Sequence, residues 1–123
     1  MNFANMIQEF LEAIKRRDLQ QILSLFSIDE DVFLILLNGA PINGHSAFIN
    51  LQTAWLADPD WKLEYKILRT IETAELAYAM LLIDYSDPAL TDQLFNKPQY
   101  LSLVFTRKND RWCLVHDQTT VVL

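Results

Sequence analysis

Cysteine, glycine and basic residues are all scarce in this sequence. Its 123 residues include 1 Cys, 2 Gly and 2 His, and 10 Lys and Arg stand against 16 Asp and Glu, which gives a formal net charge of −6. The single cysteine, Cys113, excludes an internal disulfide. The shortage of Lys and Arg argues against nucleic acid and an anionic membrane surface as partners, because both are bound through clustered positive charge.

Long hydrophobic runs are also lacking. The longest one, residues 76–83, is much shorter than the roughly 20 residues that a transmembrane helix needs. The first ten residues, MNFANMIQEF, contain no basic region followed by a continuous apolar stretch, which a signal peptide would have. We therefore expect a soluble, cytoplasmic protein.

Sites for metals and phosphate cofactors are not indicated either. The His and Cys residues lack zinc-ligand spacing, and the acidic pairs at positions 29/31 and 58/60 lack the other ligands of a calcium loop. Both glycines, Gly39 and Gly44, stand at turn positions, so a glycine-rich phosphate loop is absent from the sequence. We expect no metal and no cofactor.

The first half of the sequence has helical periodicity in three places. Apolar residues recur at helical spacing over residues 3–16, and Asn2 can cap this helix. Residues 18–21, Asp-Leu-Gln-Gln, have the form of a capping box and predict a short second helix. A third helix is predicted over residues 45–57. Between the second and third helices, the apolar run VFLILL at 32–37 predicts a buried strand that follows an acidic loop.

The second half of the sequence predicts β-structure. A polar loop is expected from Asp87 to about Pro98, and the other connections are short. The pattern favours one α+β domain over residues 1–123, with three helices packed on an antiparallel sheet. The four long strands are predicted at residues 61–71, 75–86, 99–107 and 111–120.

The strands at 75–86 and 99–107 are apolar on both faces. Three helices can cover one face of the sheet, so the other face needs a partner. The small residues Ala77 and Ala79 would let a second sheet approach closely. We therefore expect a homodimer joined through the outer sheet face by an isologous interface. The alternative is a twisted monomeric sheet whose outer face is partly covered by the long polar loop.

The last strand, RWCLVHDQTT, follows a turn signal at Asn109-Asp110 and alternates in character. Alternation would place the even-numbered residues from 112 to 120 on one face, with His116 and Gln118 at the floor of a pocket. Asp117 would then point to the opposite face, where it cannot orient the His116 ring.

The spacing Trp-x-x-x-His followed by hydroxyl residues near the C-terminus resembles the SnoaL-like branch of the nuclear transport factor two-like superfamily. Gln118 stands where a second His is common in that pattern. The order of elements extends the resemblance over nearly the whole chain. It implies a cystatin-like fold, a cone-shaped barrel of three N-terminal helices packed on a strongly curved antiparallel sheet, with a pocket on the concave face. Members of the superfamily include small-molecule isomerases, dehydratases and cyclases, and also association domains such as that of calcium/calmodulin-dependent kinase.

Two residues are candidates for catalysis. His116 carries an imidazole that titrates near neutral pH and can act as a general base or acid. The alternative is a core histidine that is satisfied by a hydroxyl or a backbone group. Asp84 follows a strand face with Tyr78 and Met80, where burial would raise its pKa and suit it to proton abstraction. The alternative for Asp84 is a solvated acid at a strand end.

The predicted function is the binding of a small, largely apolar molecule in the cone pocket by a homodimer. If the pocket is catalytic, we expect a cofactor-independent isomerase or dehydratase in which a tyrosine donates a hydrogen bond to a carbonyl. The alternative is a non-catalytic association domain, and two or more polar groups that converge inward would favour a ligand. The residues expected to bind the ligand are Tyr65, Tyr78, Met80, Trp55 and Gln118.

Overall fold

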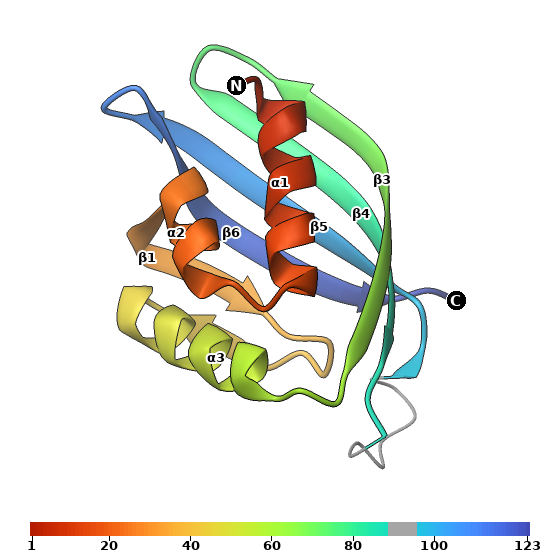
Figure 1. Cartoon of the computed structure of the whole chain (residues 1–123). Coiled ribbons are helices and arrows are strands. Elements are labelled where there is room, and N and C mark those ends of the chain that lie inside the picture. Colours follow the sequence, from red (N-terminus) through yellow and green to blue (C-terminus); the bar gives the residue numbers. More distant parts are fainter. Residues whose placement is uncertain (89–95) are drawn as a thin grey trace.

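The computed structural model describes residues 1–88 and 96–123 and has an α+β fold (Figure 1). Most of the predicted polar loop therefore lies outside the described residues. The third helix has the predicted bounds. The first strand begins at residue 27 rather than 32, the short strand over residues 41–43 was not predicted, and the remaining elements differ from prediction only at their ends. In chain order the elements are α1 (Phe3–Lys15), α2 (Leu19–Leu25), β1 (Ser27–Ile35), β2 (Pro41–Asn43), α3 (His45–Ala57), β3 (Lys62–Glu72), β4 (Leu76–Ser86), β5 (Gln99–Lys108) and β6 (Arg111–Val121).

Local sequence signals start the first two helices and the last hairpin as predicted. The side chain of Asn2 accepts a hydrogen bond from the backbone N–H of Asn5, and Asp18 caps α2 in the same way. Asn109 and Asp110 turn the chain between β5 and β6 with φ angles of 52° and 59°, a backbone conformation that Asn and Asp tolerate well. None of the helices in the described part combines the length and the apolar character that crossing a bilayer requires.

The six strands form one curved sheet in the order β2-β1-β6-β5-β4-β3. Four pairings are antiparallel, but β1 runs parallel to β6. The sheet is therefore mixed rather than antiparallel throughout, and it stays open because β2 and β3 form its two ends. The expected acidic loop at residues 29–31 is wrong, because these residues belong to β1 at a point where its pairing with β6 shifts register. Such pairing joins distant parts of the chain and leaves no local signal.

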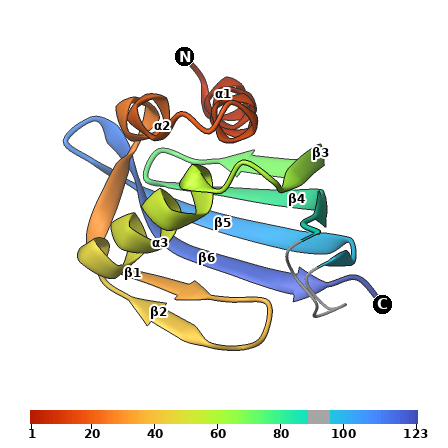
Figure 2. The same cartoon turned by 60° about the horizontal axis from the view of Figure 1, so that its bottom comes forward.

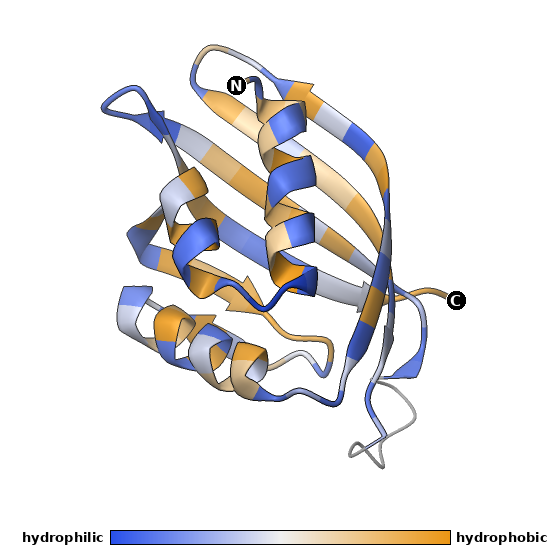
Figure 3. Cartoon of the chain, in the orientation of Figure 1, coloured by the Kyte–Doolittle hydropathy of each residue, from blue (hydrophilic) through white to orange (hydrophobic). Residues whose placement is uncertain are grey.

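The three helices lie on the concave face of the sheet (Figures 1 and 2). An aromatic cluster joins the layers at one end of the molecule: Phe3 of α1 packs edge-to-face on Phe105 of β5 and on Trp112 of β6, at centroid distances of 5.3 and 5.7 Å. Phe26, after α2, packs on Phe105 at 5.0 Å. Apolar residues cover much of the strands behind the helices, whereas hydrophilic residues mark the outer side of α1 (Figure 3). The hydrophobic core therefore fills one end of the cone.

Candidate functional site

The other end of the space between helices and sheet is a cavity with a volume of about 440 Å³. Cavities of this size hold small organic molecules in other proteins. All three helices and most of the strands contribute to it. Its apolar lining includes Phe10, Ile22, Phe48, Leu63, Leu101 and Leu114, and its polar lining consists of Gln52, Asp58, Tyr85, Asp87, Gln99, Asp117 and Thr119.

Asp117 is the most unusual polar residue of the cavity. It lies in β6 between Leu103 of β5 and Leu34 of β1, so its carboxyl group projects from the middle of the sheet. The residue is half-buried, and it lines the cavity among mostly apolar side chains. Burial raises the pKa of Asp117 to about 7. Among the described residues, no hydrogen-bond donor or cation partners this carboxyl group, so nothing offsets the loss of water.

A β-bulge places Asp117 inside, contrary to the strict alternation expected for this strand. In the pairing of β5 with β6, Phe105 lies opposite Leu114 and Val104 lies opposite His116, which leaves Val115 as an extra residue. The side chains that face inward are therefore Trp112, Leu114, Asp117 and Thr119. The predicted positions of His116 and Gln118 on the pocket floor are wrong, because the bulge reverses which residues point inward.

His116 and Gln118 lie on the convex face of the sheet. The His116 ring stacks on Phe33, which is 37% exposed, with ring centroids 6.2 Å apart. Its Nδ1–H donates a hydrogen bond to the backbone carbonyl of Phe33 over 2.8 Å. This is the backbone-satisfied alternative for His116, although on the surface rather than in the core. Gln118 is exposed.

The other predicted site residues are also placed differently, except Trp55, which lines the cavity. On β4 the odd-numbered residues from 77 to 83 are buried against the core, so Tyr78, Met80 and Asp84 project from the convex face. Asp84 is exposed, as in the solvated alternative. Tyr65 lies beneath α1, where its hydroxyl accepts a hydrogen bond from Gln8, and it does not line the cavity.

Trp55 belongs to an aromatic stack at the cavity. Its ring lies parallel to that of Trp61, with centroids 4.5 Å apart and an interplanar angle of 12°. The Trp61 indole N–H donates to the Trp55 carbonyl over 2.8 Å, and the Arg17 guanidinium covers the far side of Trp61 at 3.8 Å from the ring centroid. The Trp55 indole N–H donates to the Tyr85 hydroxyl over 3.1 Å. The stack therefore holds the Tyr85 phenol at the cavity.

Tyr85 stays protonated at neutral pH. Burial raises the pKa of Tyr85 above its ordinary value of 10.0, and the negative charges of Asp87 and Asp58 raise it further, against the opposing hydrogen bond from Trp55. Its hydroxyl also makes a side-chain hydrogen bond with Asp87, in which the protonated phenol is the donor.

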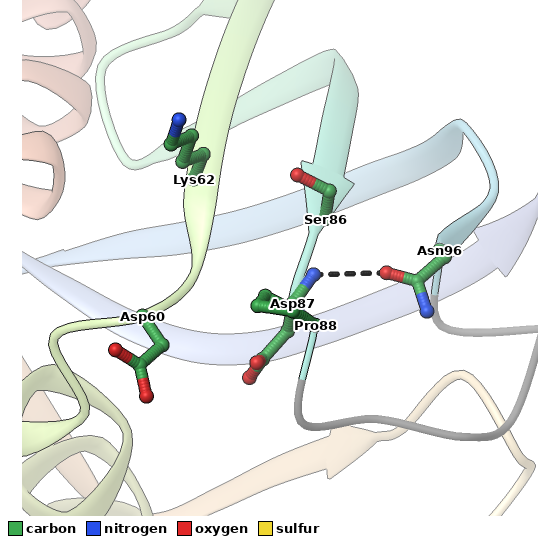
Figure 4. A pocket seen from close by; sticks show the side chains of 6 residues that line it. All are labelled: Asp60, Lys62, Ser86, Asp87, Pro88 and Asn96. Carbon is green, nitrogen blue, oxygen red and sulfur yellow. Dashed lines mark hydrogen bonds between the residues drawn. The ribbon is translucent and has the colours of Figure 1, made fainter.

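Asp87 also borders a second, more open depression of about 420 Å³, formed with Asp60, Lys62, Ser86, Pro88 and Asn96 (Figure 4). The backbone N–H of Asp87 donates to the Asn96 side chain over 2.8 Å, which joins the two ends of the segment outside the described residues. Asp87 itself is only 4% exposed. The larger cavity is the candidate site because it is more enclosed and mostly apolar.

The sequence matches the family model of the SnoaL-like domain over residues 4–123. The chain belongs to this family. The resemblance inferred from the C-terminal pattern is thus confirmed, and the match leaves only the first three residues outside it. No curated protein matches this SnoaL-like chain.

Solved structures show the same fold at low sequence identity. A proposed calcium/calmodulin-dependent protein kinase type II association domain from Thiobacillus denitrificans has a TM-score of 0.76 and 18% identity, with 99% of this chain and 96% of that chain covered. A proposed dehydratase of the nuclear transport factor two-like family from Streptomyces avermitilis has a TM-score of 0.76 and 16% identity, over 98% and 93%. An epoxide hydrolase of M. tuberculosis has a TM-score of 0.65 and 14% identity, over 96% and 80%. At such low identities, the structural likeness shows the fold of the SnoaL-like chain alone.

Proposed function

We propose that this SnoaL-like protein binds a small, largely apolar molecule in the cavity and transfers a proton on it without a cofactor, as an isomerase or dehydratase. The observation that carries the proposal is the Asp117 carboxyl group, unpartnered among the described residues in an apolar cavity, with a pKa of about 7. A general acid or base works best when its pKa lies near the working pH, because both protonation states are then accessible.

Asp117 and Tyr85 divide the proposed chemistry between them. The ionised Asp117 removes a proton from the carbon next to a carbonyl group. The electron pair left behind is stabilised as an enolate by the hydroxyl of Tyr85, which gives up its hydrogen bond to Asp87 and donates to the ligand oxygen instead. In an isomerisation the proton returns to another carbon. In a dehydration the electron pair expels a hydroxyl group, which takes a proton and leaves as water. The dehydratase and the epoxide hydrolase among the structural neighbours support small-molecule chemistry in this fold.

Filling the cavity tests the binding step. Leu101 lines the cavity, so Leu101→Trp is expected to weaken the binding of a neutral probe, phenylbutanol, by about 20-fold or more because the larger ring occupies the ligand volume. Isothermal titration calorimetry measures the affinity. The matched control, Leu68→Trp, makes the same change at a residue that is 43% exposed and should bind as the unmodified protein does. Equal affinities of both variants, or no binding by the unmodified protein, would contradict the proposal.

We also propose that the functional unit is a homodimer joined through the convex face of the sheet. This face carries exposed or half-exposed apolar side chains, among them Phe33, Tyr78, Met80 and Tyr100. Such a patch suits another sheet packed face to face. Ala77 and Ala79 do not take part as expected from the sequence: both are buried on the concave side, where their small side chains leave room for the core.

Met80→Glu is expected to convert the dimer to a monomer, because it introduces a charge into the middle of the apolar face. Multi-angle light scattering during size-exclusion chromatography measures the mass. Gln20→Glu adds the same charge at an exposed position of α2 and should leave the mass unchanged. A monomeric unmodified protein, or a dimeric Met80→Glu variant, would rule out this interface.

An association domain remains the second candidate function. It is favoured by the apolar convex face and by the likeness to the proposed kinase association domain from Thiobacillus denitrificans. Under this function the assembly forms, but the cavity binds no small molecule. A stable dimer that fails to bind phenylbutanol would favour association over ligand binding.

A further inference from the structure

We propose that the cavity selects an apolar molecule that carries a protonated amine. This inference rests on the proposed binding function and specifies the class of ligand. Three aspartates, Asp58, Asp87 and Asp117, line the cavity, whereas no Lys, Arg or His side chain lines it among the described residues. The segment 89–95, ALTDQLF, contains no basic residue in its sequence, so it adds none.

The three carboxyl groups come from different elements of the fold. Asp58 ends α3, Asp87 follows β4, and Asp117 lies within β6. In the described part of the chain, no three acidic, His or Cys side chains gather closely enough to hold a metal ion. Asp58 and Asp87 both act on the Tyr85 phenol, whereas Asp117 adds a carboxyl group from the middle of the sheet. The charged side chains that line the cavity in the described part of the chain are therefore all acidic. In a mostly apolar cavity a charge acts more strongly than in water, so a cation is attracted and a carboxylate ligand is repelled.

Two basic residues, Arg17 and Lys62, lie close to the aspartates without lining the cavity. Lys62 borders the second depression with Asp87, and Arg17 is held by other contacts. Its guanidinium donates to the backbone carbonyls of Asp58 and Trp61 and lies over the Trp61 ring. Arg17 does not line the cavity, and it contacts the backbone of Asp58 rather than the side chain. The aromatic rings of Trp55 and Tyr85 do line the cavity, and ring faces of this kind attract ammonium groups.

Entry of an ammonium group is coupled to the proton on Asp117. In the empty cavity Asp117 holds its proton up to about pH 7, because burial disfavours the ionised form. A bound ammonium group favours the carboxylate, so binding releases that proton and becomes tighter as the pH rises through this range. The other titratable groups that face the cavity are the carboxyl groups of Asp58 and Asp87 and the phenol of Tyr85. An alkylamine, like the Lys side chain, stays protonated throughout.

Three probes that differ only at one end test the inference by calorimetry at pH 8: phenylbutylamine, phenylbutanol and phenylbutyrate. The amine is expected to bind about tenfold more tightly than the alcohol, and the carboxylate at least about tenfold more weakly. If the alcohol binds as tightly as the amine or more tightly, the inference is overturned while the proposed binding function stands. If none of the three binds, both are overturned.

Two variants that each remove one negative charge distinguish the effect of a charge in the cavity from the effect of the protein's net charge. Asp117→Asn is expected to reduce the preference for amine over alcohol at least about fivefold. In this variant the preference should also no longer increase between pH 6 and pH 8. Asp110→Asn changes an exposed turn residue whose φ of 59° Asn also tolerates, and it should keep both. If both variants lose the preference equally, it arises from the net charge of the protein and the assignment to the cavity is wrong.

Discussion

Asp117→Asn is expected to stabilise the protein at pH 8 and to have little effect on its stability near pH 4. The pKa of Asp117 is about 7 in the folded protein, against an ordinary value of 3.8. Between these values the folded state holds a proton that the unfolded state has lost, so the free energy of unfolding falls as the pH rises. The loss is complete above about pH 7 and amounts to about 4 kcal/mol if the whole shift is realised. Asn keeps the shape of the side chain without titrating.

Urea unfolding of the unmodified protein, Asp117→Asn and Asp110→Asn between pH 5 and pH 8 measures this effect. The advantage of Asp117→Asn over the unmodified protein should grow by about 2.5 kcal/mol across this range. Asp110→Asn removes the same charge from an exposed turn and should follow the unmodified protein. Parallel profiles for all three proteins would mean that Asp117 is ionised and hydrated in the folded state, which would also remove the basis for its role as a base.

Trp55→Ala is expected to lower the free energy of unfolding by about 3 kcal/mol, at the low end for a buried Trp because this ring is half-buried. The change removes the stacking partner of Trp61 at 4.5 Å, the hydrogen bond to the Tyr85 hydroxyl and part of the cavity lining. Binding of phenylbutanol should weaken as well, because the Tyr85 phenol loses its support. Urea unfolding at pH 7 and the near-ultraviolet circular dichroism of the Trp pair measure the two structural effects.

Trp55→Phe separates the stacked ring from the indole N–H. Phe keeps an aromatic ring against Trp61 but cannot donate to Tyr85, so we expect a loss of about 1 kcal/mol, the usual contribution of one hydrogen bond. If Trp55→Phe costs as much as Trp55→Ala, the hydrogen bond rather than the stack would be the main contribution of this residue.

Local chemistry in the sequence determined where several elements begin and turn. Asn2 and Asp18 cap helices whatever lies far away in the chain, because a capping side chain binds backbone N–H groups two or three residues further on. The Asn109-Asp110 turn is local in the same sense. The pattern from Trp112 onward was also sufficient to recognise the family. These features depend on neighbouring residues, which is why the sequence alone reveals them.

The face that each strand turns to the cavity was decided only by the tertiary structure. Alternation divides β4 into two apolar faces, but only the helices packed on the odd-numbered residues show that Met80 and Asp84 point outward. The extra residue at Val115 arises from the pairing of β6 with β5. Because of it, Asp117 rather than His116 faces the cavity. The sequence did hold one signal, an acid in the middle of a strand. Its pKa and its role as the cavity's unpartnered carboxyl group follow from burial among residues distant in the chain.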